Sequence, residues 1–351
     1  MSLARTFKNL GQKFSRVFSA GLGIDLGTAN TLVYARGRGI IINEASVVAL
    51  NQKTGAIVAV GASAKRMVGK APPHIAVIRP LKAGVVSDFE VAEEMLRYFI
   101  GQTRRGLFSY PRSRVVIAVS SGASEVQRRA AREAAKNAGA GEVFLVEEPL
   151  AAALGGRLPV REAEGMLVVD IGGGTTEIAV LSLGSIVLSR TLKNAGDRFD
   201  QDIIDFGREH YQISIGERSA EEIKIAIGSA KPLGEPIRFT MRGRHILTGL
   251  PRAVAVGDEE IRRALASSVS AIVSNAKAVM EETPPELVAD ILRRGIYLAG
   301  GGALLNGLAE ILAEETGVAV NRADEPLTAV ARGAGVIIED FERFRELVKS
   351  E

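Results

Sequence analysis

The stretch VVDIGGGTTEIAV, residues 168–180, runs from an apolar segment through Asp170, three glycines and two threonines into a second apolar segment. Apolar runs separated by glycine predict a strand, a turn and a strand. Glycines after a strand often bind phosphate, but no P-loop lysine follows here and the expected helix is missing. Taken alone, the stretch predicts an ordinary hairpin turn in which the aspartate is a local turn former.

An earlier stretch, GIDLGTANTLVYA at residues 23–35, has the same layout of strand, aspartate, apolar residue, Gly, Thr and second strand. Two such copies about 145 residues apart predict two similar α/β halves that face each other. Glycine turns can present backbone N–H groups to phosphate, since no Cβ blocks the approach. The hydroxyls of Thr28, Thr175 and Thr176 add donors.

The aspartate of each copy, Asp25 and Asp170, would repel phosphate directly. A carboxylate can instead hold Mg²⁺ through water molecules, which is how this ion usually binds beside phosphates. Two hairpins from opposed halves would therefore hold a polyphosphate chain from both sides, with magnesium between the carboxylates and the phosphates.

Length and composition limit the classes of fold and site that the chain can have. The chain has 351 residues, 46% hydrophobic and 24% charged, which indicates two or more globular domains. It has no cysteine, which excludes disulfides and thiolate metal sites. The three histidines, His74, His210 and His245, have no partner at ligand spacing and are predicted to be surface residues. No apolar run approaches the roughly 20 residues that span a bilayer.

The net charge of +3 is concentrated at the N-terminus. Residues 1–20 hold four of the 44 basic residues and no acid, so the rest of the chain has 40 basic and 41 acidic residues. A neutral body argues against nucleic acid as the main partner, because such a partner needs a basic face on the folded part.

At helical spacing, residues 1–20 place cations on one side and large apolar side chains on the other. This pattern predicts a helix that lies in a membrane surface. A mitochondrial presequence has a similar pattern, and so has a helix packed on its own protein. The apolar side consists of Leu3, Phe7, Leu10, Phe14, Val17 and Phe18.

The body reads as strands and helices in the order expected of an α/β protein. Ser124 and Gln127 form a capping-box pattern for a helix that Gly139 stops, and Asp258 is predicted to cap a long helix that ends near Glu282. Further helices are predicted near residues 61–69, 88–102, 197–209 and 219–229, a buried strand at 114–121, and a smaller β segment at 236–256.

Other nucleotide and hydrolase motifs are missing. No Walker A sequence occurs, no G-x-G-x-x-G follows a strand, and no G-x-S-x-G elbow is present. A P-loop, a Rossmann dinucleotide site and an acyl-transfer triad are therefore disfavoured.

Seven motifs in order resemble the MreB family of bacterial actins. They are GIDLGTANTLVY, VFLVEEPLAAALG, VVDIGGGTTEIAV, AGDRFDQDII, IKIAIGSA, TPPELVADI and LAGGGALL, and the resemblance runs from about Gly23 to about Gly335. This set is more specific than the signature of the wider superfamily of actins, sugar kinases and heat-shock chaperones. The resemblance implies an actin-like α/β fold with ATP in a cleft between two similar halves, each carrying a smaller subdomain.

The resemblance also implies the subdomain boundaries. After the membrane helix at 1–20, subdomain IA would comprise 21–47, 95–160 and 330–351, and IB would be 48–94. Subdomain IIA would comprise 161–198 and 258–329, and IIB would be 199–257.

The resemblance also implies which residues of this sequence would bind ATP and Mg²⁺, motif by motif. Asp25 and Asp170 would hold Mg²⁺ through water, and Glu148 would orient the attacking water with Thr175 as its helper. A helix N-terminal acid that complements the dipole is the alternative for Glu148. The nucleotide-binding residues would be Asp25, Gly27, Thr28, Ala29, Asn30, Asp170, Gly172, Gly173, Gly174, Glu221, Glu222, Ile223, Lys224, Gly300, Gly301, Gly302 and Ala303.

The family also binds membrane through an N-terminal helix and a small apolar loop. Leu107 and Phe108, flanked by arginines in RRGLFSYPRSR, are the candidates for the loop. Packing of these two side chains into the protein is the alternative. Two departures from the family pattern, Ser120-Ser121 and Ala45 in place of proline, put local loop geometry in doubt.

The resemblance implies a slow ATPase that polymerises into membrane-associated cytoskeletal filaments, paired as protofilaments, and organises wall synthesis and rod shape. Its partners would be further copies of itself, the anionic inner face of the cell membrane and membrane proteins of the wall-synthesis machinery. A sugar-type kinase of the same superfamily is the alternative, although no base aspartate is found in a matching context. A chaperone would need a substrate domain, and the chain ends soon after Gly335.

Overall fold

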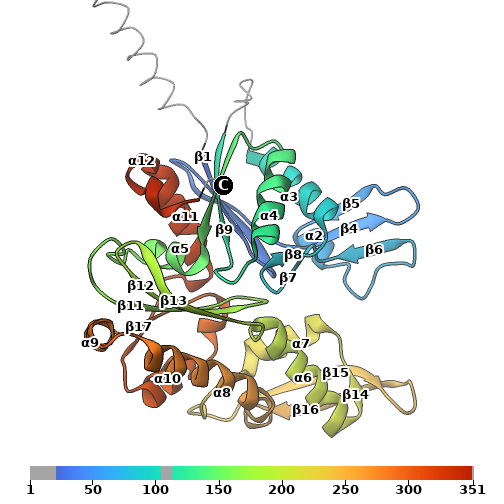
Figure 1. Ribbon diagram of the computed structural model, residues 1–351. Coiled ribbons are helices and arrows are strands. Elements are labelled where there is room, and N and C mark those ends of the chain that lie inside the picture. The colour runs from blue at the N-terminus through green and yellow to red at the C-terminus, as the bar shows by residue number, and fades with distance from the viewer. Residues whose placement is uncertain (1–20, 104–112, 350–351) are drawn as a thin grey trace, which may run out of the picture.

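The computed structural model describes residues 21–103 and 113–349. The predicted membrane helix at 1–20 and the loop residues Leu107 and Phe108 lie outside the described residues. Two five-stranded sheets form the body, one in the upper and one in the lower half of Figure 1.

The two sheets have the same strand order, which confirms the repeat predicted from the two aspartate–glycine stretches. In each, a three-stranded antiparallel meander is extended by two strands parallel to its first strand. The first sheet contains β1 (Gly21–Leu26), β2 (Asn30–Ala35), β3 (Gly39–Ala45), β9 (Arg114–Val119) and β10 (Glu142–Glu147) in the order β10-β9-β1-β2-β3. The second contains β11 (Met166–Ile171), β12 (Thr176–Ser182), β13 (Ser185–Leu192), β17 (Ile296–Ala299) and β18 (Val320–Arg322) in the order β13-β12-β11-β17-β18.

The two aspartates occupy equivalent places in these sheets. Asp25 is the penultimate residue of β1 and pairs with Ala118 of β9, and Asp170 is the penultimate residue of β11 and pairs with Ala299 of β17. Ligands of α/β proteins bind outside the carboxyl ends of parallel strands. The repeat therefore places both aspartates at the ends of the sheets where a ligand is expected.

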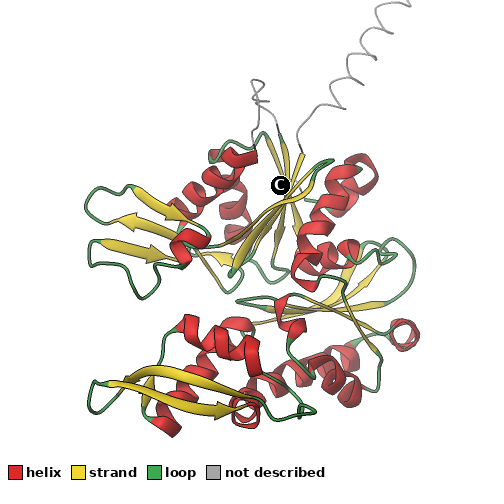
Figure 2. Cartoon of the chain, turned by 180° about the vertical axis from the view of Figure 1, so that it is seen from behind, coloured by secondary structure: helices red, strands yellow, loops and turns green. Residues whose placement is uncertain are grey.

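Helices cover the sheets and also separate them (Figures 1 and 2). Most follow the 3.6-residue pattern in which one apolar stripe faces the sheet. The helices are α3 (Phe89–Thr103), α4 (Glu125–Asn137), α5 (Glu148–Gly155), α6 (Gly196–Tyr211), α8 (Asp258–Glu282), α9 (Pro285–Arg294), α10 (Leu308–Thr316), α11 (Ala329–Glu339) and α12 (Phe341–Phe344), with 3-10 turns η1 (Gly301–Leu304), η2 (Pro326–Thr328) and η3 (Arg345–Leu347).

Helices α5 and α11 pack closely between the two sheets. A Cβ atom built on Gly155 would lie 1.9 Å from the carbonyl oxygen of Ala329, and one on Gly333 would lie 1.7 Å from that of Ala151. Only glycine permits this approach. The apolar core around the two helices contains side chains of both sheets, so it joins the two halves.

Smaller β elements extend from each half on the same side of the molecule (Figure 2). The predicted subdomain boundaries remain predictions, although these elements fall within the ranges proposed for IB and IIB. The first half carries β4 (Val48–Asn51), β5 (Ile57–Val60), β6 (Ile75–Ile78), β7 (Leu81–Lys82), β8 (Val85–Val86) and α2 (Ala62–Lys65). The second carries β14 (Ile213–Ser214), β15 (Arg238–His245), β16 (Pro251–Gly257) and α7 (Glu217–Ile227).

Helix termini test the capping predictions. Ser124 and Gln127 form the predicted capping box of α4, and Gly139 follows that helix with φ +102°. The prediction for Asp258 was wrong, because Gly257 is the N-cap of α8 and Asp258 is its first residue. The Asp258 carboxylate instead accepts from the N–H of Ile237 at 3.0 Å, which ties the helix to the chain before β15. Helix α2 is also shorter than the predicted 61–69.

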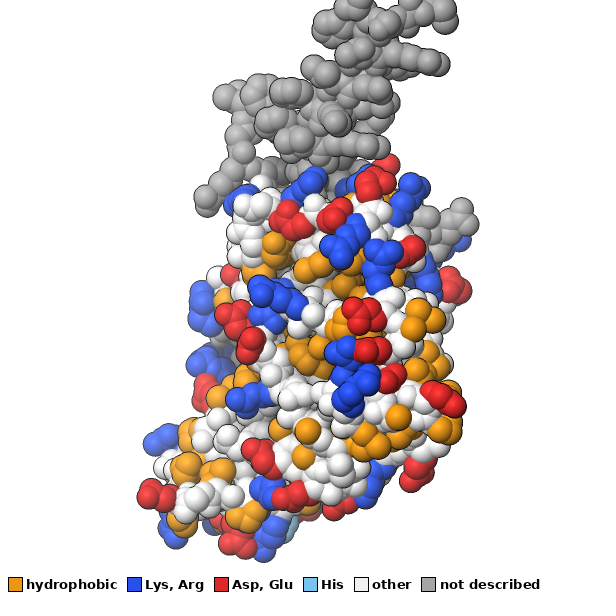
Figure 3. All heavy atoms as spheres, turned by 90° about the vertical axis from the view of Figure 1, so that its left-hand side faces the viewer, with side chains coloured by type: hydrophobic (Ala, Val, Ile, Leu, Met, Phe, Trp, Pro, Cys, Tyr) orange, Lys and Arg blue, Asp and Glu red, His pale blue; other side chains and the backbone are white. Residues whose placement is uncertain are grey.

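Charged side chains of both signs are interspersed on the face shown in Figure 3. Charged side chains of the described residues form exposed ion pairs such as Arg161–Glu346 at 2.9 Å and Lys277–Glu315 at 2.6 Å. Exposed pairs of this kind contribute little to stability, about 0–1 kcal/mol each. The fold therefore depends on its apolar cores rather than on these pairs.

Candidate functional site

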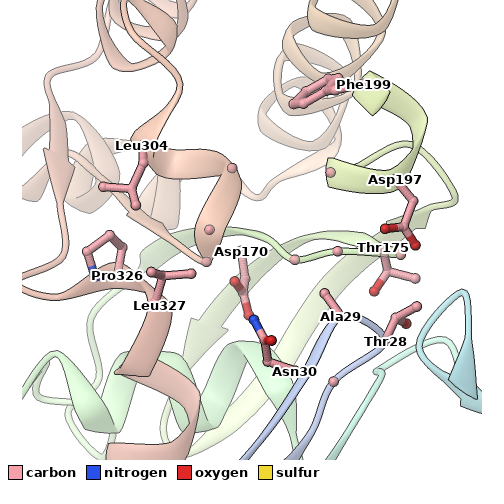
Figure 4. A pocket seen from close by; sticks show the side chains of 18 of the residues that line it. Thr28, Ala29, Asn30, Asp170, Thr175, Asp197, Phe199, Leu304, Pro326 and Leu327 are labelled. Atoms are coloured by element: carbon pink, nitrogen blue, oxygen red, sulfur yellow. The ribbon is translucent and has the colours of Figure 1, made fainter. Parts of the chain in front are cut away.

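A cavity of about 440 Å³ lies between the two halves. Ligand pockets typically measure about 300–1,000 Å³, so a small-molecule ligand fits. Most of its walls come from the β1–β2 turn, the β11–β12 turn, the segment from β17 through η1 to η2, and the facing sides of α6 and α7, with single residues from α5, α11 and the β7–β8 hairpin. In Figure 4 the apolar side chains of Leu304, Pro326 and Leu327 lie at one side of the cavity, and Thr28, Thr175 and Asp197 at the other.

Two hydrogen bonds from Ser46 hold the β1–β2 turn in place. The Ser46 hydroxyl donates to the carbonyl oxygen of Gly27 at 2.6 Å, and its N–H donates to that of Ala29 at 3.0 Å. The hydroxyl of Thr28 accepts from the N–H of Gly84 in the β7–β8 hairpin at 2.9 Å. Two carbonyl groups of this turn, those of Gly27 and Ala29, therefore accept hydrogen bonds from Ser46.

The β11–β12 turn packs against the β1–β2 turn at the edge of the cavity. The N–H of Gly172 donates to the carbonyl oxygen of Thr175 at 2.9 Å and closes the turn. A Cβ built on Gly173 would lie 2.6 Å from the Cβ of Ala29, and one on Gly174 would lie 2.6 Å from the Thr28 hydroxyl oxygen. The glycines are therefore needed because the two turns approach each other too closely for side chains.

The turn after β17 packs against the second aspartate. Gly300 has φ +78° and ψ 169°, a conformation that is essentially restricted to glycine. A Cβ on it would lie 2.4 Å from a carboxylate oxygen of Asp170 and 2.3 Å from the carbonyl oxygen of Ile171. Beyond this turn the lining becomes apolar, with Ile225, Leu304, Pro326, Leu327 and Val330. Such a wall suits a flat, apolar ring.

Helices α6 and α7 supply charged groups. Lys224 donates to the carbonyl oxygen of Gly196 and pairs with Asp200, both at 2.9 Å. Glu221 lies one helical turn before Lys224 and also lines the cavity. Hydroxyl groups of a sugar could reach this edge.

Two ion pairs link the smaller subdomains across the mouth of the cleft. Lys65 of α2 pairs with Glu221 of α7 at 2.7 Å, and Arg79 pairs with Glu217 at 2.8 Å. Each pair joins a residue of the first half to a residue of the second. Because Glu221 also lines the cavity, the contact that closes the mouth shares a residue with the ligand site.

Three carboxyl groups line the cavity, the buried Glu148 and Asp170 and the half-buried Asp25, with no hydrogen bond or ion pair to them from any described residue. Burial raises the pKa of Asp25 to about 7, and burial followed by the charges of Asp25 and Glu177 raises the pKa of Asp170 to about 8. Burial, then Glu177, Asp25 and Asp170, raises the pKa of Glu148 well above its ordinary value. Uncompensated carboxyl groups of this kind fit a divalent cation, which prefers oxygen ligands.

No group of three or more Asp, Glu, His or Cys side chains within residues 21–103 and 113–349 is arranged to hold a metal ion directly. His74 and His210 are exposed as predicted, and the half-buried His245 contacts the Thr248 hydroxyl at 2.9 Å. In the same part of the chain, no helix is both long and apolar enough to cross a bilayer.

Most of the predicted site residues meet at the cavity, but three do not line it. Glu222 is exposed and pairs with Arg218, whereas Ile223 and Ala303 are buried in the core of the second half. The predicted residues that line it are Asp25, Gly27, Thr28, Ala29, Asn30, Glu148, Asp170, Gly172, Gly173, Gly174, Thr175, Glu221, Lys224, Gly300, Gly301 and Gly302.

The structure adds lining residues that the sequence motifs left without a role. Asp197 and Asp200 stand in AGDRFDQDII, one helical turn apart, which is the signal that could have identified them. Gly84 comes from the β7–β8 hairpin, and Pro326 and Leu327 come from η2. None of these three carries a motif that points to a ligand.

The chain matches the MreB/Mbl protein family over residues 19–346. The cell shape-determining protein MreB of Escherichia coli (strain K12) is 51% identical over 332 residues, which cover 93% of this chain and 96% of that protein. The cell shape-determining protein Mbl of Bacillus subtilis (strain 168) is 47% identical over 328 residues, 93% of this chain and 98% of that protein.

Solved structures show the same similarity. MreB5 of Spiroplasma citri bound to ADP superposes with a TM-score of 0.89 at 36% identity, over 94% of this chain and 99% of that one. The same protein bound to AMPPNP also gives 0.89. A chain of the MamK double helical filament gives 0.79 at 24% identity, over 92% and 99% of the two chains, and shares the fold.

Proposed function

The chain belongs to the MreB/Mbl family, and from this membership we propose that it is an ATP-binding, slowly ATP-hydrolysing cytoskeletal protein that forms membrane-associated filaments. The fold is actin-like and the family is one of cell shape-determining proteins. The observation that carries the proposal is the meeting of the two aspartate–glycine turns across one cavity, where Gly173 touches Ala29 and Gly174 touches Thr28.

Each part of ATP has a matching wall. The phosphates would lie against the two turns, whose residues line the cavity and whose backbone N–H groups and Thr28 and Thr175 hydroxyls would serve as donors. The base would lie against the apolar side chains near Leu304 and Leu327, and the ribose would reach Glu221 and Lys224. The MreB5 structures that this fold resembles were solved with ADP and with AMPPNP, which supports a nucleotide as the ligand.

Hydrolysis would depend on Glu148. This residue is the first of α5, directly after β10; it is 8% exposed and lines the cavity. Thr175 lines the same cavity from the second half. Phosphoryl transfer needs chiefly positioning and neutralisation of charge. We propose that Glu148 orients the attacking water and accepts its proton, with the Thr175 hydroxyl as a second contact.

Magnesium would be held by Asp25 and Asp170 through water and would neutralise phosphate charge. Its charge would also offset the two aspartates that raise the pKa of Glu148. The residues fit the ion because both carboxyl groups line the cavity and have pKa values that burial raises.

Binding of Mg²⁺-ATP at pH 7 is expected to release protons. Free Asp25 and Asp170 have pKa values raised to about 7 and about 8, and a bound cation favours their ionised forms. Because their pKa values are raised from 3.8 to about 7 and about 8, the nucleotide-free chain loses stability as pH rises from about 4 to about 8, and the loss is complete above the folded pKa values. Nucleotide affinity rises as pH approaches those values, because the cation binds the ionised carboxyl groups. Calorimetric titrations in two buffers of different ionisation enthalpy measure the protons. Identical heats in both buffers would contradict the assignment of these carboxyl groups.

The partners follow from the family. Filaments would form from further copies of the chain, paired as protofilaments, since a MamK filament has the same fold. Residues 1–20 would lie on the anionic inner face of the cell membrane, with Leu107 and Phe108 as a second contact. There the filament would meet membrane proteins of the wall-synthesis machinery and organise rod shape. We propose accordingly a cytoplasmic protein that lies peripherally on the inner face of the membrane.

Sedimentation with Mg²⁺-ATP separates this proposal from the sugar-kinase alternative. The filament proposal expects polymer that pellets only with nucleotide, and phosphate release that rises with polymer mass and needs no sugar. ATP consumption that requires an added sugar, with no polymer at any protein concentration, would establish the kinase instead.

A further inference from the structure

Glu177 is a buried carboxylate beside the site that ATP binding does not use. It lies on β12 directly opposite Asp170 of β11, and it is 0% exposed. One oxygen accepts from the hydroxyls of Ser120 and, at 3.3 Å, of Thr191. The other accepts from the N–H of Ser121 at 2.9 Å and from its hydroxyl at 2.5 Å. Four donors thus converge on it, and no cation of the described residues pairs with it.

The network of Glu177, Ser120, Ser121 and Thr191 crosses between the two halves. Glu177 and Thr191 belong to the second sheet, whereas the serines follow β9 of the first. A Cβ on Gly122 would lie 2.7 Å from the Thr191 hydroxyl oxygen, so the serine turn packs directly on β13. A fully satisfied buried network of this kind is rigid.

On the first half, the network continues to Glu148. The parallel strands β9 and β10 pair Val119 with Glu147, so Ser120 and Glu148 both follow directly at neighbouring strand ends. Arg128, which is buried, donates to the carbonyl oxygen of Ser121 at 3.1 Å and to the Glu147 carboxylate at 3.2 Å. The serine turn is therefore tied to the residue immediately before Glu148.

On the second half, Glu177 lies close in sequence to Thr175, the proposed second contact of the attacking water. Thr175 precedes Glu177 by two residues, and the turn that holds Thr175 ends where β12 begins. Gly84 of the β7–β8 hairpin contacts both the serine turn and Thr175, since a Cβ on Gly84 would lie 3.4 Å from the Ser120 Cβ and 3.2 Å from the Thr175 hydroxyl oxygen. Glu148 and Thr175 come from opposite halves. Glu177 connects the serine turn, which is tied to Glu147, with the strand that begins directly after Thr175.

We propose that Glu177 is a positioning residue for ATP hydrolysis, which locks the serine turn of one half to the Thr175 turn of the other and so fixes the distance between Glu148 and Thr175. The inference rests on the proposed ATPase function. A displacement of about 1 Å in such a pair costs about 100-fold in rate. The Ser120 hydroxyl, at a position where the family resemblance leads one to expect proline, supplies a donor that proline lacks.

Two substitutions at Glu177 separate positioning from mere burial of a side chain. In Glu177→Leu the volume is filled but all four donors lose their acceptor. In Glu177→Gln the amide oxygen can accept from Ser121, and the amide nitrogen can donate to the Ser120 and Thr191 hydroxyls, which can reverse. We expect Glu177→Leu to lower kcat about 10- to 100-fold at equal polymer mass, with the KM for ATP unchanged within about threefold. Glu177→Gln should stay within about threefold of the unaltered chain.

A double substitution covers the case in which Glu177→Leu fails to fold. Ser120→Ala with Ser121→Ala removes two donors and leaves Glu177 in place, and kcat should fall in the same direction with ATP affinity retained. Wild-type kcat in both Glu177→Leu and the serine double variant would overturn the inference alone, and so would a fall in Glu177→Gln equal to that in Glu177→Leu. Absence of hydrolysis in the unaltered chain would overturn the proposed function, and this inference with it.

Discussion

Glu148→Gln is expected to abolish most ATP hydrolysis while ATP still binds and filaments still form. The glutamine amide fills the same space at the start of α5 but cannot accept a proton from water. Loss of a general base costs about 10²- to 10⁴-fold in rate. Phosphate release per polymer mass measures the effect, and a fluorescent nucleotide measures the affinity, which should change less than about threefold because Glu148 is assigned to the attacking water and not to the nucleotide.

Glu142→Gln is the matched control, since Glu142 lies on β10, the strand that leads to Glu148, and its side chain is 64% exposed. It should hydrolyse ATP at the rate of the unaltered chain. Normal turnover in Glu148→Gln would remove Glu148 from the mechanism. It would leave the alternative that this carboxyl group merely complements the dipole of α5.

Gly300→Ala is expected to weaken ATP binding about 100-fold or more. A side chain at φ +78° and ψ 169° costs about 1–3 kcal/mol in backbone strain alone. Its Cβ would also collide with the Ile171 carbonyl oxygen at 2.3 Å and with the Asp170 carboxylate at 2.4 Å. To relieve that collision, either the turn at Gly300 or the Asp170 carboxylate that is assigned to magnesium must move. Equilibrium titration with a fluorescent ATP analogue measures the loss.

Gly295→Ala separates this local effect from general destabilisation. Gly295 stands at the other end of β17, has a similar conformation at φ +86° and ψ 174°, and meets the Ala319 carbonyl oxygen at 2.6 Å from a built Cβ. It does not line the cavity. Both variants should lower the melting temperature, but only Gly300→Ala should lose ATP affinity. An equal loss of affinity in both would show that the turn after β17 has no specific part in binding.

The repeated layout around Asp25 and Asp170 sufficed to predict two similar halves, because the strand, aspartate and glycine order determines both local structure and the edge of the sheet that it occupies. Helix periodicity limited the prediction for α7. The motif was carried over as the block Glu221–Lys224, yet on a helix only residues one turn apart face the same way, so Glu221 and Lys224 line the cavity whereas Ile223 points into the core. The same spacing applies to Asp197 and Asp200.

Contacts between distant segments could not be predicted from local patterns. Ser120 and Ser121 were interpreted as a change in loop geometry, and nothing near them in the sequence indicates their partner, Glu177, 56 or more residues away. Asp258 looked like a helix cap because acids favour that position, but the N–H of Ile237, the residue just before β15, donates to the same carboxylate. In each case tertiary packing decided between two roles that the residue type allows.

Electron microscopy of the full chain on anionic liposomes, with and without Mg²⁺-ATP and with and without residues 1–20, tests the central claim most directly. The account predicts paired filaments on the lipid surface only when nucleotide is present. Removal of residues 1–20 should release those filaments from the lipid without preventing their assembly. Liposomes that stay bare with Mg²⁺-ATP while the chain remains unpolymerised in solution would contradict the claim that this protein is an ATP-switched filament of the membrane surface.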